Sequence, residues 1–314
     1  MLPPWTIRVS SCVGNCSPQG GRTTSCGVSG GPESSSGSAG APTCRPPGAP
    51  PRFEVRHALL AAVRDEREAA DGVLSHVSAA VLHGLSTWGL PLHRIHRTRD
   101  RRTGGRVGEG VHVHAAPLAP HEVVEVDGLL VTTAARTVID VARTAGLDAA
   151  VAVADSALHK HLTDPDELAR AARRCTGWPG APKARRVVAL ADGDSDSVGE
   201  SRSRLAIQRA GLPEPVLQWK VAGNGRVYEA DFGWPELRTV GEFDGLFKYG
   251  RLLEPGQDPA DVVVAEKLRE DEIRDLDLRV VRWIWAELEN FVPVAERLRR
   301  AFAASPAGAR WRRR

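Results

Sequence analysis

The chain has 314 residues, which is long enough for two domains that each bury a core. Its formal net charge of +3 is mildly basic, which is compatible with a nucleic-acid partner but too weak to require one. No stretch approaches the ~18 apolar residues of a membrane span and no apolar signal-peptide segment opens the chain, so we expect a cytoplasmic protein with no membrane partner.

The first segment, residues 1–50, is rich in Gly, Ser and Pro and shows no apolar periodicity. We predict that it is disordered, or that it is a mis-assigned start ahead of the true coding sequence. Four of the five cysteines lie here, without a histidine or a repeated C-x-x-C pair to complete a zinc site, so we expect incidental thiols.

Residues 53–191 predict an α/β domain. Helical spacing covers 57–70 and 75–85, with Ser75 as N-cap. Short alternating runs then predict strands at 94–98, 111–115 and 122–126, and the glycine-rich stretch 104–110 reads as a hairpin loop. Four further helices are predicted at 132–145, 147–162, 164–174 and 181–192.

All ten histidines fall in this domain, including His76, His83, His112 and His114. An H-x-H pair on a strand and an H-x6-H pair on a helix match no strong zinc pattern. We therefore expect ordinary histidines on loops and strand faces, and no metal cluster.

Residues 195–304 predict a second α/β domain, with the element order α-β-β-β-α-β-α. Ser197 and Glu200 form a capping-box pattern at the start of its first helix. Three strands follow as a meander, then a helix at 258–276, a strand at 278–285 and a final helix to about Ala304. Residues 305–314 form a basic tail.

The meander places acids opposite one another. If 235–238 connects the second and third strands, Trp234 faces Thr239, Asp231 faces Glu242 and Glu229 faces Asp244. The four acids then share one face, and the opposite face carries the apolar side chains of Tyr228, Ala230, Phe232 and Phe243.

Like charges opposed across a strand pair destabilise a sheet by roughly 0.2–1 kcal/mol each, so a cation is expected between them. Hard oxygen ligands favour Mg²⁺ or Mn²⁺, with Asp231, Glu242 and Asp244 as metal ligands. The alternative is a solvated acidic face with no bound ion.

Several motifs carry a resemblance to known families. "GES" around Glu200, Gln218, "ADF" with Asp231 and "GEFDG" with Glu242 and Asp244 resemble the PD-(D/E)XK nuclease superfamily, near the very-short-patch-repair endonucleases. "VLSHVSAAVLHGL" and "TTAARTVIDVA" are similar to AbiEi-type antitoxins or regulators. The resemblance covers about 57–290 and implies a restriction-endonuclease-like mixed sheet flanked by helices, behind a regulatory or docking domain.

The resemblance implies a metal-dependent DNA endonuclease, acting in defence or repair. Asp231 and Glu242 would hold the cation, and Glu200 would orient a water or a second ion. The superfamily places a lysine where this chain has Asp244, so Lys248 or Lys267 would have to supply the cationic group. Phosphate contacts are expected from Arg202, Arg204 and Arg274.

A second function stays open at this point. The chain could be an AbiEi-like antitoxin or transcriptional regulator whose nuclease fold is catalytically inactive and binds DNA or a cognate toxin. Asp244 at the lysine position favours this alternative, whereas the group of four acids favours the enzyme. AbiEi-like relatives carry a DNA-reading winged helix, and residues 1–50 show no such pattern.

Overall fold

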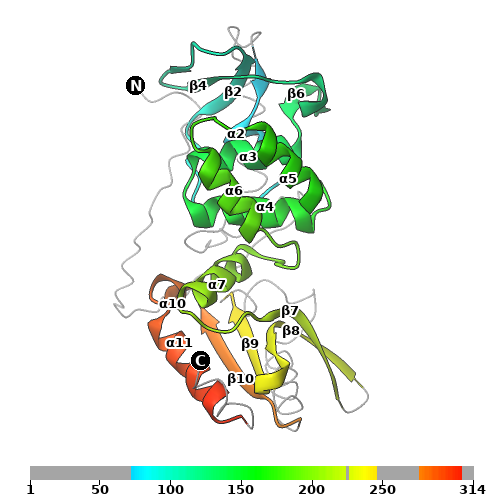
Figure 1. Ribbon diagram of the computed structural model, residues 1–314, viewed down its shortest axis with the longest axis vertical. Coiled ribbons are helices and arrows are strands. Elements are labelled where there is room, and N and C mark those ends of the chain that lie inside the picture. The colour runs from blue at the N-terminus through cyan, green and yellow to red at the C-terminus, as the bar shows by residue number, and fades with distance from the viewer. Residues whose placement is uncertain (1–71, 224–225, 246–275, 306–314) are drawn as a thin grey trace, which may run out of the picture.

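The structure is a computed structural model that describes residues 72–223, 226–245 and 276–305. The expectations for residues 1–50, for the helices at 57–70 and 258–276, and for the tail after residue 305 lie outside these residues. Within them the fold is α/β with two mixed sheets, as predicted from the sequence (Figure 1). None of their helices combines the length and the apolar character needed to cross a membrane.

The first sheet has six strands in the order β3-β4-β2-β1-β6-β5. The parallel pairs are β2 with β4 and β1 with β6, and the others are antiparallel. The strands are β1 (Val73–Leu74), β2 (Ile95–Asp100), β3 (Arg106–Val107), β4 (Val111–Ala116), β5 (Val123–Val126) and β6 (Leu129–Thr132). The stretch 104–110 was predicted to be a hairpin loop, but Arg106–Val107 within it forms β3, which pairs with β4 in a tighter hairpin. β1 and β6 were not predicted either.

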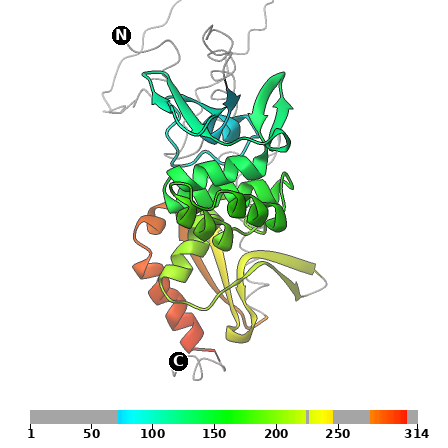
Figure 2. The same ribbon diagram turned by 45° about the horizontal axis from the view of Figure 1, so that its top comes forward.

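Five helices accompany this sheet: α2 (His76–Leu82), α3 (Ala134–Thr144), α4 (Leu147–His159), α5 (Pro165–Arg174) and α6 (Ala181–Leu190). Asp164 caps α5 through a hydrogen bond from Glu167 N, and Pro165 takes the first helical position, as the sequence predicts. α4 consists largely of Ala and Val and is buried on nearly all sides, because it packs against α3, α6 and α7 (Val198–Arg209). Figures 1 and 2 both show α3–α6 as a layer between the two sheets.

Helix α7 (Val198–Arg209) belongs to two hydrophobic cores. Leu205 packs in the core of α2–α6, and Ile207 packs in the core of the second sheet. The two side chains are about 200° apart around the helix axis, so α7 is buried on opposite faces. Ion pairs from Arg204 to Asp155 and from Arg209 to Asp148 add polar contacts between α7 and α4.

The second sheet has the order β10-β9-β8-β7. Its strands are β7 (Val216–Gly223), β8 (Arg226–Trp234), β9 (Thr239–Asp244) and β10 (Arg279–Ile284). β7, β8 and β9 form the predicted antiparallel meander, and β10 is parallel to β9. The short helix η2 (Pro235–Leu237) makes the turn, and Trp234 pairs with Thr239 as expected. α10 (Trp285–Glu289) and α11 (Val292–Ala303) follow β10, and Figure 1 shows α11 along the sheet.

The predicted alternation of β8 is broken near its middle. Tyr228, Ala230, Phe232 and Phe243 are all buried, but Phe232 and Phe243 pack in the core under α7 and α11, whereas Tyr228 and Ala230 pack in a separate cluster with Val240. Gln218, on the neighbouring strand opposite this point, has a left-handed φ of 46°. An extended strand cannot hold that angle, so the alternation of β7 is interrupted at Gln218. The four apolar residues of β8 and β9 divide between two clusters.

A close contact at Gly199 sets the position of the first turn of α7. A Cβ built on Gly199 would overlap the ring of Phe243, which itself packs edge-on against Trp285. We predict that Gly199→Ala destabilises the protein by about 1–3 kcal/mol, although Ala is the better helix former. Urea unfolding monitored by circular dichroism would measure this loss.

The matched control for this prediction is Gly146→Ala, because a Cβ on Gly146 meets open space. It should change stability by less than 1 kcal/mol. Adding Phe243→Leu should recover part of the loss caused by Gly199→Ala, and strictly additive losses would contradict the steric cause.

Candidate functional site

Glu200 lies in the first turn of α7 with its side chain buried. Ser197 Oγ accepts a hydrogen bond from Glu200 N at 3.2 Å and donates one to Glu200 Oε1 at 2.7 Å. The backbone N–H of Asp196 donates to Glu200 Oε2 at 3.0 Å. The predicted capping interaction is thus present, and it fixes the carboxyl group at the helix N-terminus.

The same carboxyl group also faces the second sheet. Gln218 Nε2 on β7 donates to Glu200 Oε2 at 2.8 Å. Burial is the main cause that raises the pKa of Glu200 to about 7, and the charge of Asp231 raises it further, against the opposing effect of the Ser197 hydrogen bond. Glu200 therefore serves the cap and lies close enough to Asp231 for the two charges to interact.

Asp231 lies on β8, where β8 and β9 stop pairing. The last backbone pair is Phe232 with Gly241, and one step further in this register Asp231 would face Glu242. Its Oδ2 accepts a hydrogen bond from Phe243 N at 2.8 Å instead. The carboxylate thus takes the place of a backbone acceptor and holds the end of β9 beside β8.

Glu242 and Asp244 differ in their surroundings. Glu242 is buried, and its Oε2 accepts from Arg282 Nε at 2.8 Å across the β9–β10 pair. Asp244 is half-buried, and its Oδ1 is shielded from solvent without a hydrogen-bond partner among the described residues. Glu229, the fourth acid of the sequence pattern, is exposed.

The structure therefore brings together Glu200, Asp231 and the end of β9, and it leaves Glu229 outside. Within residues 72–223, 226–245 and 276–305, these acids do not form a group of three whose oxygen atoms all lie within 4.8 Å of one another. Lys248, Lys267 and Arg274 lie outside the described residues, so their predicted roles remain predictions.

Arg202 and Arg204 are engaged inside the chain. Arg202 is buried, donates to Glu289 Oε1 at 2.8 Å and lies over the ring of Trp88 at 4.4 Å. Arg204 Nη2 donates at 2.9 Å to Asp155, whose pKa burial raises to about 6 although Arg204 opposes the shift. Both guanidinium groups thus join α7 to its neighbours, and their positions give no support to the expected phosphate contacts.

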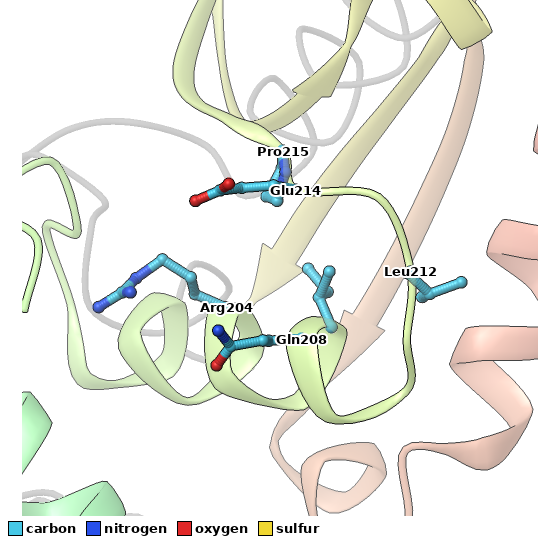
Figure 3. Close-up of a pocket in the computed structure, with 6 residues that line it drawn as sticks. Arg204, Gln208, Leu212, Glu214 and Pro215 are labelled. Carbon is cyan, nitrogen blue, oxygen red and sulfur yellow. The ribbon is translucent and has the colours of Figure 1, made fainter. Parts of the chain in front are cut away.

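Figure 3 shows a small cavity beside Arg204, between α7 and the start of β7. Its volume is about 100 Å³, roughly the size of a few water molecules. It is lined by Arg204, Ile207, Gln208, Leu212, Glu214 and Pro215. None of these is among the acids of the second sheet, so this cavity is not part of the acidic site.

The histidines of the first sheet are gathered together, contrary to the expectation of separate loop and strand-face positions. One ring nitrogen each of His76, His96 and His114 lies within 4.8 Å of the others. His112 stacks on His114 with ring centroids 3.8 Å apart. The H-x-H pair on β4 was a visible signal, but the contribution of His96 depends on the pairing of β2 with β4, which spacing along the chain does not reveal.

Comparison with known proteins gives two relatives. The chain is 32% identical over 171 residues to the uncharacterized protein MT2308 of Mycobacterium tuberculosis strain CDC 1551 / Oshkosh and to the uncharacterized protein Rv2248 of strain ATCC 25618 / H37Rv. The match covers 54% of this chain and 61% of each relative, so the chain spans less than two thirds of their length. No family model and no solved structure matches the chain.

The raised pKa of Glu200 has a measurable consequence for stability. The carboxyl group holds its proton more tightly in the fold, where its pKa is about 7, than in the unfolded chain, where the ordinary glutamate pKa is 4.5. Protonation of Glu200 therefore adds its full contribution to the free energy of unfolding below about pH 4.5. This contribution, at most about 3 kcal/mol, is lost as the pH rises through about 7. Glu200→Gln, which mimics the protonated form, should gain stability relative to wild type by that amount between pH 4.5 and 8, as measured by urea unfolding.

Glu236→Gln is the control for this difference, because Glu236 is exposed in the turn between β8 and β9. It should show the pH dependence of the wild type. A Glu200→Gln curve that runs parallel to the wild type across this range would mean that the carboxyl group is not perturbed.

Proposed function

We propose that the protein is a metal-dependent DNA endonuclease whose reaction centre is the acidic site between α7 and the meander. One observation carries the proposal: a buried glutamate on α7 and an aspartate on β8 lie close enough to interact electrostatically, at the point where β8 and β9 diverge. The succession of α7, an antiparallel meander and the parallel strand β10 also supports the resemblance to PD-(D/E)XK nucleases.

The acids at this site offer the carboxylate oxygens that a hard divalent cation prefers, although they would have to draw closer together to share one ion. Asp244 Oδ1 is a buried oxygen without a hydrogen-bond partner among the described residues, as expected of a ligand atom. Glu242 Oε2 is engaged by Arg282 at 2.8 Å, so Glu242 would have to exchange this ion pair for the metal ion. Asp231, Glu242 and Asp244 would hold Mg²⁺ or Mn²⁺, which when bound neutralises phosphate charge and makes water more acidic.

Glu200 and Gln218 would act on the proton and on the position of the attacking water. With a pKa of about 7, the Glu200 carboxyl group can both take up and release a proton near neutral pH. Gln218 holds one of its oxygens through the 2.8 Å hydrogen bond, and Ser197 holds the other. These contacts fix the direction of the carboxyl group before any substrate binds.

A second candidate function is a DNA- or toxin-binding regulator that retains the nuclease fold without activity. The ion pair between Glu242 and Arg282, and the internal use of Arg202 and Arg204, favour it. Cleavage by the purified protein distinguishes the two functions, because only the first requires it.

The test is cleavage of supercoiled plasmid DNA by the full chain with Mg²⁺ or Mn²⁺, followed on agarose gels. We expect nicking that EDTA abolishes. Asp231→Asn and Asp244→Asn should each reduce the rate at least about 100-fold, because each removes a negatively charged ligand atom. Glu200→Gln should lower the rate by a similar factor through loss of the proton acceptor.

The control is again Glu236→Gln, a change of the same chemistry on the exposed turn, which should cleave like wild type. Nicking that persists in Asp231→Asn would identify a contaminating nuclease. The absence of nicking with every metal would refute the enzyme and leave the regulator.

A further inference from the structure

The first sheet carries a second polar centre, which lies apart from the acids of the second sheet. On β4, His112 and His114 point to the same side of the strand because they are two residues apart. The parallel pairing places His96 of β2 beside His112, and Thr98 beside His114. His96 and His114 are therefore diagonal neighbours on one face of the sheet.

His76, the first residue of α2, brings a third imidazole to this face of the sheet. It begins α2 with a left-handed φ of 50°, a conformation that a histidine adopts only at a cost, and its side chain is buried. Its ring stacks on that of His114 with centroids 3.6 Å apart. Three separate elements thus deliver one imidazole each to a single point.

The nitrogen positions suit a metal ion. His96 Nδ1 and His114 Nε2 are 3.0 Å apart, close to the ~3.4 Å that separates two ligands of a tetrahedral zinc ion bound at about 2.1 Å. Without a cation, one of these two nitrogens must carry a proton for the contact to be favourable. With a cation between them, both can direct lone pairs at it.

One ring nitrogen of His76, Nδ1, has a hydrogen-bond partner that can fix its tautomer. His76 Nδ1 lies 3.0 Å from Ser75 Oγ, and Ser75 Oγ also accepts a hydrogen bond from Thr98 Oγ1 at 2.8 Å. If Nδ1 donates to Ser75, the lone pair on Nε2 is free for the metal. The backbone supports the same arrangement, because Ser75 N donates to His96 O at 3.0 Å.

The protonation state agrees with ligand character. Burial is the main cause that lowers the pKa of His96 to about 4 and that of His114 to about 2, with further lowering by neighbouring histidines. Burial likewise lowers the pKa of His76 well below its usual value. All three rings are therefore neutral near pH 7, the form that binds metals.

The cluster also borders an open space. A cavity of about 300 Å³ lies against His76, His112 and His114 and extends to the loop at Gly104 and Gly105. Arg102 and Arg143 also line it, and Asp140 pairs with Arg143 at 3.2 Å. A metal held by three protein ligands has room here for a water or a small anion as fourth ligand.

We propose that His76, His96 and His114 bind one divalent transition-metal ion of the zinc class, with an open coordination position toward this cavity. Imidazole-only ligation selects Zn²⁺, Co²⁺ or Ni²⁺ over the hard ions Mg²⁺ and Ca²⁺. The inference does not depend on the proposed nuclease function, since its ligands lie on α2, β2 and β4, away from the second sheet.

The test uses untagged full-length protein in which Cys12, Cys16, Cys26 and Cys44 are changed to Ser, so that neither a tag nor the N-terminal thiols bind metal. The protein is stripped with EDTA and dialysed, then titrated with Zn²⁺ by calorimetry, with metal content measured by mass spectrometry. We expect one equivalent of Zn²⁺ and a rise in melting temperature, because the metal binds only the folded chain. Co²⁺ should give the visible absorption of a four-coordinate site.

Two ligand variants and one control complete the test. His96→Asn and His114→Asn should each weaken Zn²⁺ binding at least tenfold, whereas His121→Asn, at an exposed histidine, should not. Asp231→Asn should also bind Zn²⁺ like the protein with an intact histidine cluster. A failure of the proposed zinc site can therefore be told apart from a failure of the proposed nuclease site. The proposal would be overturned if the stripped protein with an intact histidine cluster and the four N-terminal serine substitutions bound no Zn²⁺, whether or not the ligand variants fold. Full Zn²⁺ binding by both ligand variants would also overturn it.

Discussion

Burial of the Glu200 carboxyl group beside Asp231 is the interaction on which the second sheet region depends. Glu200 accepts hydrogen bonds from Asp196 and Gln218, and from Ser197 at its other oxygen, so the loop before α7, the helix and β7 meet at one group. Asp231 does the same for β8 and β9 through Phe243 N. A buried carboxyl group beside a second, partly exposed carboxyl group is unfavourable unless one of them is protonated or a cation is bound. This electrostatic cost is the basis for proposing a cation site here.

Helix α7 is able to hold Glu200 in place because it is packed on two sides. Leu205 and Ile207 fix its rotation between the two cores, and Ser203 receives the indole N–H of Trp283 from the second sheet at 2.7 Å. Gly199 allows the close approach of Phe243. A helix fixed in this way holds its carboxyl group with little freedom, as a site that positions reactants requires.

Much of the second sheet region could be predicted from the sequence because its signals are local. The Ser197 cap, the meander and the Trp234–Thr239 pair follow from a capping pattern, strand periodicity and a proline turn. Glu229 was predicted to join the other acids, but it is exposed, and the sequence alone does not show that the side chains of β8 divide between two clusters. The internal roles of Arg202 and Arg204 depend on which elements pack against α7, and a solvated helix face would show the same residue pattern.

The histidine cluster illustrates a different limit. Its members come from a helix start and from two strands that pair in parallel, with other elements between them in the chain. Short sequence spacing identifies metal sites whose ligands share one turn or hairpin, and this cluster has no such spacing beyond the H-x-H pair. Likewise β1, with two residues, is too short to show any periodicity, although it joins the two halves of the first sheet.

The most direct measurement is an NMR titration of the Glu200 carboxyl carbon in selectively labelled protein, carried out first without divalent ions and then with Mg²⁺. Burial beside Asp231 predicts a pKa of about 7 without metal and a clear decrease when Mg²⁺ is added, because the cation offsets the neighbouring negative charge. An ordinary pKa near 4.5 that Mg²⁺ leaves unchanged would contradict both the burial of Glu200 beside Asp231 and the cation site built on it.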